Sequence, residues 1–216
     1  MNLLDVLADP RTRDDRRALR FGVVIGVVSN NQDPDKLGRV KVKFPWLVDN
    51  DESNWARVAA PMAGPDRGVS FLPDVDDEVL VAFENGDPRS PFVLGALWNG
   101  VDRPPKEKES DSDNDQLVMK SRSGHLVTLD DKSGSEKIEI RDKTKKNRVL
   151  IESSSNAITI EADGDITLKA SQGTITLDAK SIAVKSSADA KVEASGSLDL
   201  KASSTLTIKG STVNIN

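Results

Sequence analysis

Five carboxylates within a short stretch are the groups of this chain whose type and spacing could do catalytic chemistry. They are Asp74, Asp76, Asp77, Glu78 and Glu84. A pair of carboxylic acids can hydrolyse a glycosidic bond when one of them sits in an apolar pocket that raises its pKa. The run PDVDDEV, which holds four of the five, instead has the composition of a polar turn before a strand. We therefore assign no catalytic role to these residues.

His125 is the single histidine and the only candidate base for Ser/His/Asp chemistry. It lies in SGHLV, between a predicted turn and a predicted strand, with no recognisable nucleophile motif beside it. One histidine cannot form a multi-histidine zinc site, and a chain without cysteine has neither thiolate ligands nor disulfides. The sequence thus predicts no catalytic residue, no cofactor and no metal, and it places His125 on the surface or in packing beside the barrel described below.

A third candidate chemistry is the stacking of nucleic-acid bases on aromatic rings above a basic groove. Phe44 and Trp46, with Lys41 and Lys43, are the residues that could do this. However, Phe44 alternates with the valines of RVKVKF and so belongs to an apolar face. The net charge of −5 also argues against nucleic-acid binding, because proteins that bind nucleic acid usually carry an excess of basic residues.

The elements that must position these residues divide the chain into parts of different composition. All eight aromatic residues lie between residues 21 and 98. About five β-branched or alternating runs occupy residues 21–100, with turns rich in glycine, which suits a small closed barrel of the OB-fold type. Residues 1–20 form an N-terminal arm, in which Leu3, Leu4 and Leu7 have helical spacing. That arm is either a frayed helix or a segment that docks on a partner.

The second half of the chain begins with a linker and a set of wider strands. Residues 101–116 contain two prolines and a charged, polar run that cannot build a core, so they form a linker. Residues 117–151 contain alternating runs separated by SRSG, KSGS and KTKKN, which predicts a β-structured neck.

Residues 152–216 repeat about every eight residues. An apolar pair two residues apart recurs, and residues two apart on a strand point to the same face. We predict that these side chains form a buried core: Ile158, Ile160, Ile166, Leu168, Ile175, Leu177, Ile182, Val184, Leu198, Leu200, Leu206 and Ile208.

Three architectures fit such a repeat. A single-chain β-helix would complete little more than two coils, which is below the three or so repeats that stability generally requires. A disordered tail has no reason to place apolar pairs at a fixed period. Three intertwined chains, each supplying one face of a triangular prism in turn, leave no open strand edge along the needle. The predicted fold is therefore all-β: an OB-fold barrel followed by an intertwined trimeric triangular β-helix.

The barrel and neck resemble a known family. The carrying segments are GRVKVKFPW (38–46), SNWARVAAPMAGPDRGVSFLPDVDDEVLVAFENGDPRSPFVLGALWNG (53–100) and KSRSGHLVTLDD (120–131). They are similar to the spike proteins of contractile tails, which include phage baseplate assembly protein V and the valine–glycine repeat protein G of type VI secretion. The resemblance implies a structural homotrimer at a baseplate, which pierces a target envelope. An OB-fold binding module, or a glycan hydrolase or lyase on a β-helix, is the alternative.

The resemblance also implies partners. Only about 20 residues precede the barrel, so the hub is expected to be a separate protein among the baseplate components. The end of the needle, Val213, Asn214, Ile215 and Asn216, is expected to bind a conical tip protein of the proline–alanine–alanine–arginine (PAAR) kind, and an effector cargo can travel with it.

No apolar run reaches 18 residues, and the N-terminus lacks a signal-peptide core. Assembly in the cytoplasm is therefore expected, followed by release of the particle or delivery into a target envelope, with transient membrane contact. The particle type, the target cell and the cargo are not specified by the sequence.

Overall fold

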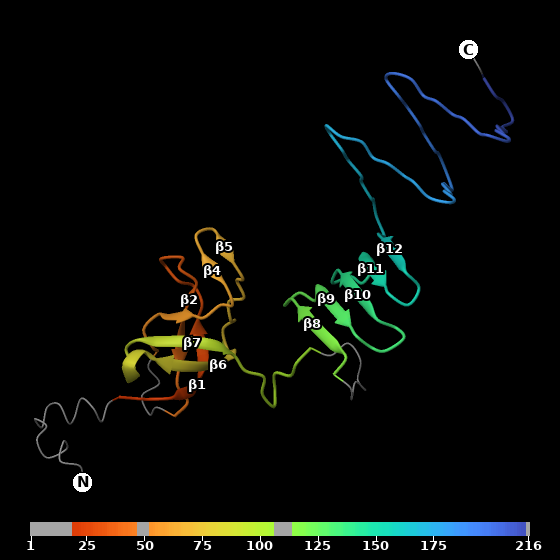
Figure 1. Ribbon diagram of the computed structural model, residues 1–216. Coiled ribbons are helices and arrows are strands. Elements are labelled where there is room, and N and C mark those ends of the chain that lie inside the picture. Colours follow the sequence, from red (N-terminus) through yellow and green to blue (C-terminus); the bar gives the residue numbers. More distant parts are fainter. Residues whose placement is uncertain (1–18, 47–51, 106–113, 215–216) are drawn as a thin grey trace, which may run out of the picture. The chain divides into compact units, whose positions relative to one another are not determined.

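The computed structural model describes residues 19–46, 52–105 and 114–214 (Figure 1). The chain separates into two units, the first ending at Asp163 and the second beginning at Gly164. Most of the predicted N-terminal arm, the centre of the predicted linker, and Ile215 and Asn216 fall outside the described residues. Within the described ranges the regular secondary structure consists of β-strands and one 3₁₀ turn at Glu84–Gly86. None of these described elements is a helix that could span a membrane.

Five strands close into a barrel. In barrel order they are β1 (Val23–Asn30), β2 (Arg39–Lys43), β3 (Ala56–Val58), β7 (Pro91–Ala96) and β6 (Glu78–Phe83). All neighbours run antiparallel except β3 and β7, which are parallel. Closure leaves no open edge, so the prediction of a small five-stranded barrel is confirmed.

The barrel core is built mostly from valine. The alternation of RVKVKF places Val40 and Val42 fully inside, and Phe44 is only 7% exposed. The other buried members are Val28, Ala56, Val79, Val81, Phe83 and Val93. Short β-branched side chains suit this narrow interior because they pack well on the pleated surface of the strands and fill the small volume without overlap.

Gly26 in β1 allows β2 to approach closely. A Cβ at this position would lie 2.3 Å from Cγ1 of Val42 and 3.2 Å from the carbonyl oxygen of Lys43. Side chains are never that close, so only glycine fits where β1 crosses the core.

Asp33 fixes the turn between β1 and β2. Its carboxylate accepts hydrogen bonds from the backbone N–H groups of Asp35 (3.1 Å) and Leu37 (2.9 Å). It also accepts two from the Arg39 guanidinium, at 2.9 and 2.7 Å. The Arg39 side chain, followed by these backbone donors, holds the pKa of Asp33 well below its ordinary value.

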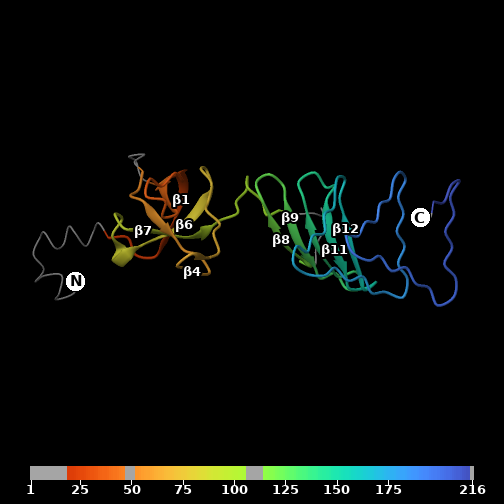
Figure 2. The same ribbon diagram turned by 90° about the horizontal axis from the view of Figure 1, so that it is seen from above.

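A two-stranded hairpin, β4 (Ala63–Gly64) and β5 (Arg67–Gly68), lies between β3 and β6 in the chain. After the barrel, five strands form a second sheet in which each strand pairs antiparallel with the next along the chain (Figure 2). They are β8 (Gln116–Lys120), β9 (Leu126–Asp130), β10 (Lys137–Arg141), β11 (Arg148–Glu152) and β12 (Ala157–Glu161). This sheet continues past residue 151, where the needle is predicted to begin.

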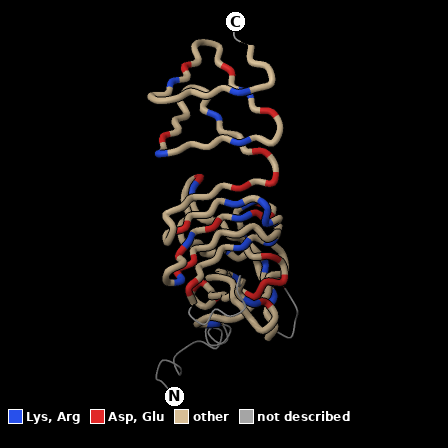
Figure 3. The backbone as a smooth tube through the Cα atoms, turned by 90° about the vertical axis from the view of Figure 1, so that its right-hand side faces the viewer, with Lys and Arg blue, Asp and Glu red and all other residues tan. Residues whose placement is uncertain are grey.

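Residues 164–214 form no strand within the single chain. They run as straight segments of about six residues separated by bends, which gives the zigzag of Figure 3. The bends fall at residues 171–173, 180, 187–188, 195–196, 203–204 and 211–212. Their spacing of about eight residues follows the period of the sequence.

Candidate functional site

One face of the five-stranded sheet is wholly apolar. The strand registers align two rows of side chains across all five strands. The first row is Leu117, Leu129, Ile138, Ile151 and Ile158, and the second is Met119, Val127, Ile140, Val149 and Ile160. We call these ten residues the apolar sheet face.

The apolar sheet face is uncovered in the single chain. Ile140 is 52% exposed, Ile160 60% and Ile158 71%. A contiguous apolar surface on which every strand contributes two side chains is larger than isolated exposed residues, and such patches mark interaction sites. Each strand contributes two side chains that are two residues apart in the sequence, because residues at that spacing in a strand point to the same face.

The opposite face of the same sheet carries most of the charged and polar residues of the strands, together with the buried side chains of Leu126 and Leu150. Arg148 and Glu161 are direct cross-strand partners, with Nε and Oε2 2.7 Å apart. The hydrogen bonds that Arg148 donates to the Glu161 carboxylate lower the pKa of Glu161 and raise the pKa of Arg148. On β8 and β9, the side-chain amide of Gln116 donates to Asp130 at 2.9 Å. The charged residues of the sheet strands thus lie on one face, and the apolar sheet face carries none.

The predicted core residues of the needle divide into two sets. The structure joins Ile158 and Ile160 to the apolar sheet face through β12. The others, from Ile166 to Ile208, lie on the zigzag with exposures between 51% for Ile175 and 84% for Val184. No segment within residues 19–46, 52–105 and 114–214 buries them. At the predicted tip end, Val213 is 48% exposed, while Ile215 and Asn216 are outside the described residues.

The carboxylates considered for catalysis are not gathered into a pocket. Asp77 accepts a hydrogen bond from the backbone N–H of Asp74 at 2.8 Å, and the N–H of Asp76 donates to the carbonyl of Val28. These contacts define the polar turn that the sequence predicts. Glu78 belongs to β6 and Glu84 begins the 3₁₀ turn.

His125 lies on the surface at the turn between β8 and β9. Its backbone N–H donates to the Ser121 hydroxyl at 2.9 Å, and its carbonyl accepts from the Ser121 N–H. The residue closes a turn through its backbone, and its side chain is exposed. Among the described residues no group of three or more acidic or histidine side chains is arranged to hold a metal ion.

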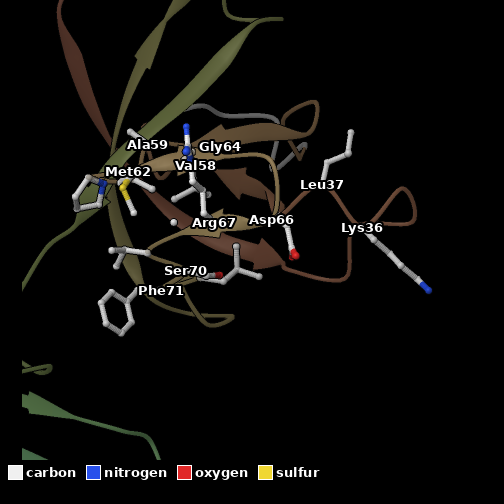
Figure 4. A pocket seen from close by; sticks show the side chains of 17 residues that line it. Lys36, Leu37, Val58, Ala59, Met62, Gly64, Asp66, Arg67, Ser70 and Phe71 are labelled. Carbon is white, nitrogen blue, oxygen red and sulfur yellow. The ribbon is translucent and has the colours of Figure 1, made fainter.

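An open groove of about 780 Å³ lies beside the β4–β5 hairpin (Figure 4). Leu37, Met62 and Phe71 contribute much of its apolar lining, and Asp66 is the only carboxylate among its lining residues. Glycoside hydrolases typically use a pair of carboxylic acids. The residues that line this groove include one, so they do not provide that pair.

The aromatic residues considered for base stacking have partners within the barrel. The ring of Phe44 packs 5.6 Å from the rings of both Trp46 and Phe83. Lys41 pairs with Glu52 at 3.1 Å and lies over the Trp55 ring. Because Phe44 packs within the barrel and Lys41 pairs with Glu52, these residues do not together form a basic groove lined by exposed aromatic rings.

Comparison with known proteins points in one direction. Residues 24–98 match the family described as the type VI secretion system/phage-baseplate injector OB domain. The chain is 30% identical over 152 residues to the type VI secretion system spike protein VgrG1a of Pseudomonas aeruginosa, which covers 64% of this chain and 23% of that protein. It is 34% identical over 111 residues to the spike protein VgrG3 of Vibrio cholerae, covering 48% and 11%.

A third relative has a different name. The actin cross-linking toxin VgrG1 of Vibrio cholerae is 28% identical over 138 residues, covering 61% of this chain and 13% of that protein. The chain thus spans less than a quarter of the length of each of these relatives. The family match, at residues 24–98, falls on the barrel.

Proposed function

Through its barrel this chain belongs to the type VI secretion system/phage-baseplate spike family, and on that premise we propose that three copies intertwine into the structural needle of a contractile spike. The observation that carries the proposal is the apolar sheet face, ten aligned side chains of which eight are exposed in the single chain and two, Val127 and Val149, are half-buried. Three such faces turned toward a common axis would bury one another, and the polar faces would point to solvent.

The zigzag supports the same arrangement. Its apolar pairs continue the period of Ile158 and Ile160 beyond the sheet, yet its straight segments have no strand partner among the described residues of their own chain. Backbone N–H and C=O groups require hydrogen-bond partners once buried. Strands from two other copies would supply these partners and cover the apolar pairs at the same time.

The resulting body has no open strand edge along its length and cannot unravel one chain without breaking ladders to two others. Such a needle would resist compression, as the puncture of an envelope requires. We propose that the part up to about residue 100 contacts a separate hub and baseplate ring. The end near Val213 would carry a PAAR-type tip protein and, through it, an effector cargo.

We also propose a structural rather than a catalytic role, assembly in the cytoplasm, and membrane contact only during puncture. In support, Asp74, Asp77 and His125 take part in turns, and Glu78 lies in a barrel strand.

The mass of the purified protein in solution tests the proposal. Light scattering should give about 70 kDa, three times the chain mass of 23.4 kDa. A folded species of one chain mass would overturn the needle and favour a free OB-fold binding module. A dimer would contradict the threefold arrangement in the same experiment.

A further inference from the structure

Charged residues recur at one fixed position of the repeat. The position lies three residues after the first member of each apolar pair, and its occupants in chain order are Glu161, Lys169, Asp178, Lys185, Glu193, Lys201 and Lys209. The sign alternates from the first of these to the sixth, and only the last two are alike. All seven are exposed in the single chain, and Figure 3 shows that both acidic and basic residues lie along the zigzag.

The structure shows the first step of this series. Glu161 stands on the polar face of the five-stranded sheet, directly opposite Arg148 of the neighbouring strand, and the two form an ion pair at 2.7 Å. The series position is thus an outward one, where side chains meet across strands. Within the zigzag, Lys191 and Glu193 also form an ion pair, as two residues on the same side of a straight segment do.

The neighbours of each charge follow from the threefold arrangement, and this inference rests on the proposed function. In three intertwined chains, consecutive octads of one chain lie on different faces of the prism. The strand next to any octad on the same face is therefore the following octad of another copy, about 4.8 Å away.

We propose that the alternating charges form ion-pair ladders between copies of this chain, one ladder on each face of the needle. Glu161 of one copy would face Lys169 of a second, which would face Asp178 of a third. The partner recognised by this surface is a second copy of the same chain, presented at a stagger of one octad.

The ladders select that stagger. If one copy slips by a single octad, Glu161 of that copy comes to lie beside Glu161 of another, and lysines meet lysines further along. Opposite charges directly across strands are favourable and like charges are not. The apolar pairs alone cannot make this distinction, because every octad presents nearly the same pair.

Two identical substitutions at different octads test the ladders. Lys185→Glu would place three acids in a row, since Asp178 and Glu193 flank it. Lys209→Glu would instead convert the single like-charge step, Lys201 beside Lys209, into an opposite-charge step. Both variants make the same change of net charge at the same outward position.

The measurements are the mass of each variant by light scattering and its melting temperature at low and high salt. Six junctions are affected in a trimer by Lys185→Glu, so we expect a melting temperature lowered by about 5 °C. Lys209→Glu should raise it by about 2 °C, and both shifts should shrink near ~1 M NaCl.

Melting temperatures that fall equally in the two variants, or shifts that persist at high salt, would overturn the ladders while leaving the trimer intact. A wild-type protein with the mass of one chain would instead overturn the proposed function itself, so the two failures are distinguishable. The Lys209→Glu variant needs no loss of folding to be informative, because its expected shift is upward.

Discussion

Ile160 and Thr159 are adjacent in β12 and point to opposite faces of the five-stranded sheet, so they provide a matched pair for testing the needle. Ile160 belongs to the apolar sheet face, whereas Thr159 lies on the polar face opposite Leu150. We expect Ile160→Asp to abolish the trimer and Thr159→Asp to leave it assembled. The introduced residue and the strand are the same in both, and only the face differs.

The size of the expected effect follows from exposure. Ile160 is 60% exposed in the single chain, so its removal costs that chain only the part already buried, about 1 kcal/mol. Burial of the remaining part on assembly would contribute about 1–2 kcal/mol per chain. An unpaired aspartate in the interior costs several kcal/mol more for each copy. Summed over three copies, the loss is on the order of 10 kcal/mol, or roughly seven orders of magnitude in the assembly constant.

The assay is light scattering after size exclusion, with the near-ultraviolet circular dichroism of the barrel as a control for folding. Every aromatic residue lies between 21 and 98, so this signal reports the barrel and not the needle. A trimeric Ile160→Asp protein would refute the assignment of this face to the interior. Equal disruption by Thr159→Asp would refute the division into an inner and an outer face.

Four further predictions concern the needle and the barrel. Ile182→Asp in the zigzag should prevent trimers for the same reason as Ile160→Asp, and light scattering would show trimers persisting if Ile182 faced solvent. Val81→Ala should lower the free energy of unfolding of the barrel by about 2 kcal/mol, because the side chain is fully buried; an unchanged urea midpoint would contradict that packing. Gly26→Ala should cost about 1–3 kcal/mol, since its Cβ would overlap Val42, and urea unfolding would reveal a tolerated substitution. The lowered pKa of Asp33 stabilises the folded state above the pKa of the unfolded chain, and this stabilisation is lost as pH falls through the folded value. Asp33→Asn should therefore weaken the barrel at neutral pH and flatten its stability profile below about pH 4, which thermal melts across that range would measure.

Much of the fold could be predicted from local patterns. The alternation in RVKVKF identifies Val40, Val42 and Phe44 as barrel core, and all three are buried. The polar turn at Asp74 and Asp77 could also be predicted, because aspartate side chains favour turns by hydrogen-bonding to nearby backbone groups.

The apolar sheet face could be predicted only in part. The pair Ile158 and Ile160 is visible as the first of the octads, but its alignment with Ile151, Ile138 and Leu129 depends on strand register. Turn lengths and hydrogen-bond pairing fix that register, and a slip of one residue would move every side chain to the other face. The alternating charges were likewise visible in the sequence, but the observed pair of Arg148 and Glu161 was needed to show what such a position does.

The sequence by itself determined the repeat of about eight residues, because the spacing of apolar and charged residues shows which side chains share a face of a strand. It also carried the family signature in residues 24–98. Only the tertiary structure decided which strands are neighbours: the parallel pairing of β3 with β7 that closes the barrel, the two aligned rows of the apolar sheet face, and the clamp of Asp33 on its turn. The physical reason is that periodicity is a local property of the backbone, whereas closure and register depend on contacts between segments distant in the chain.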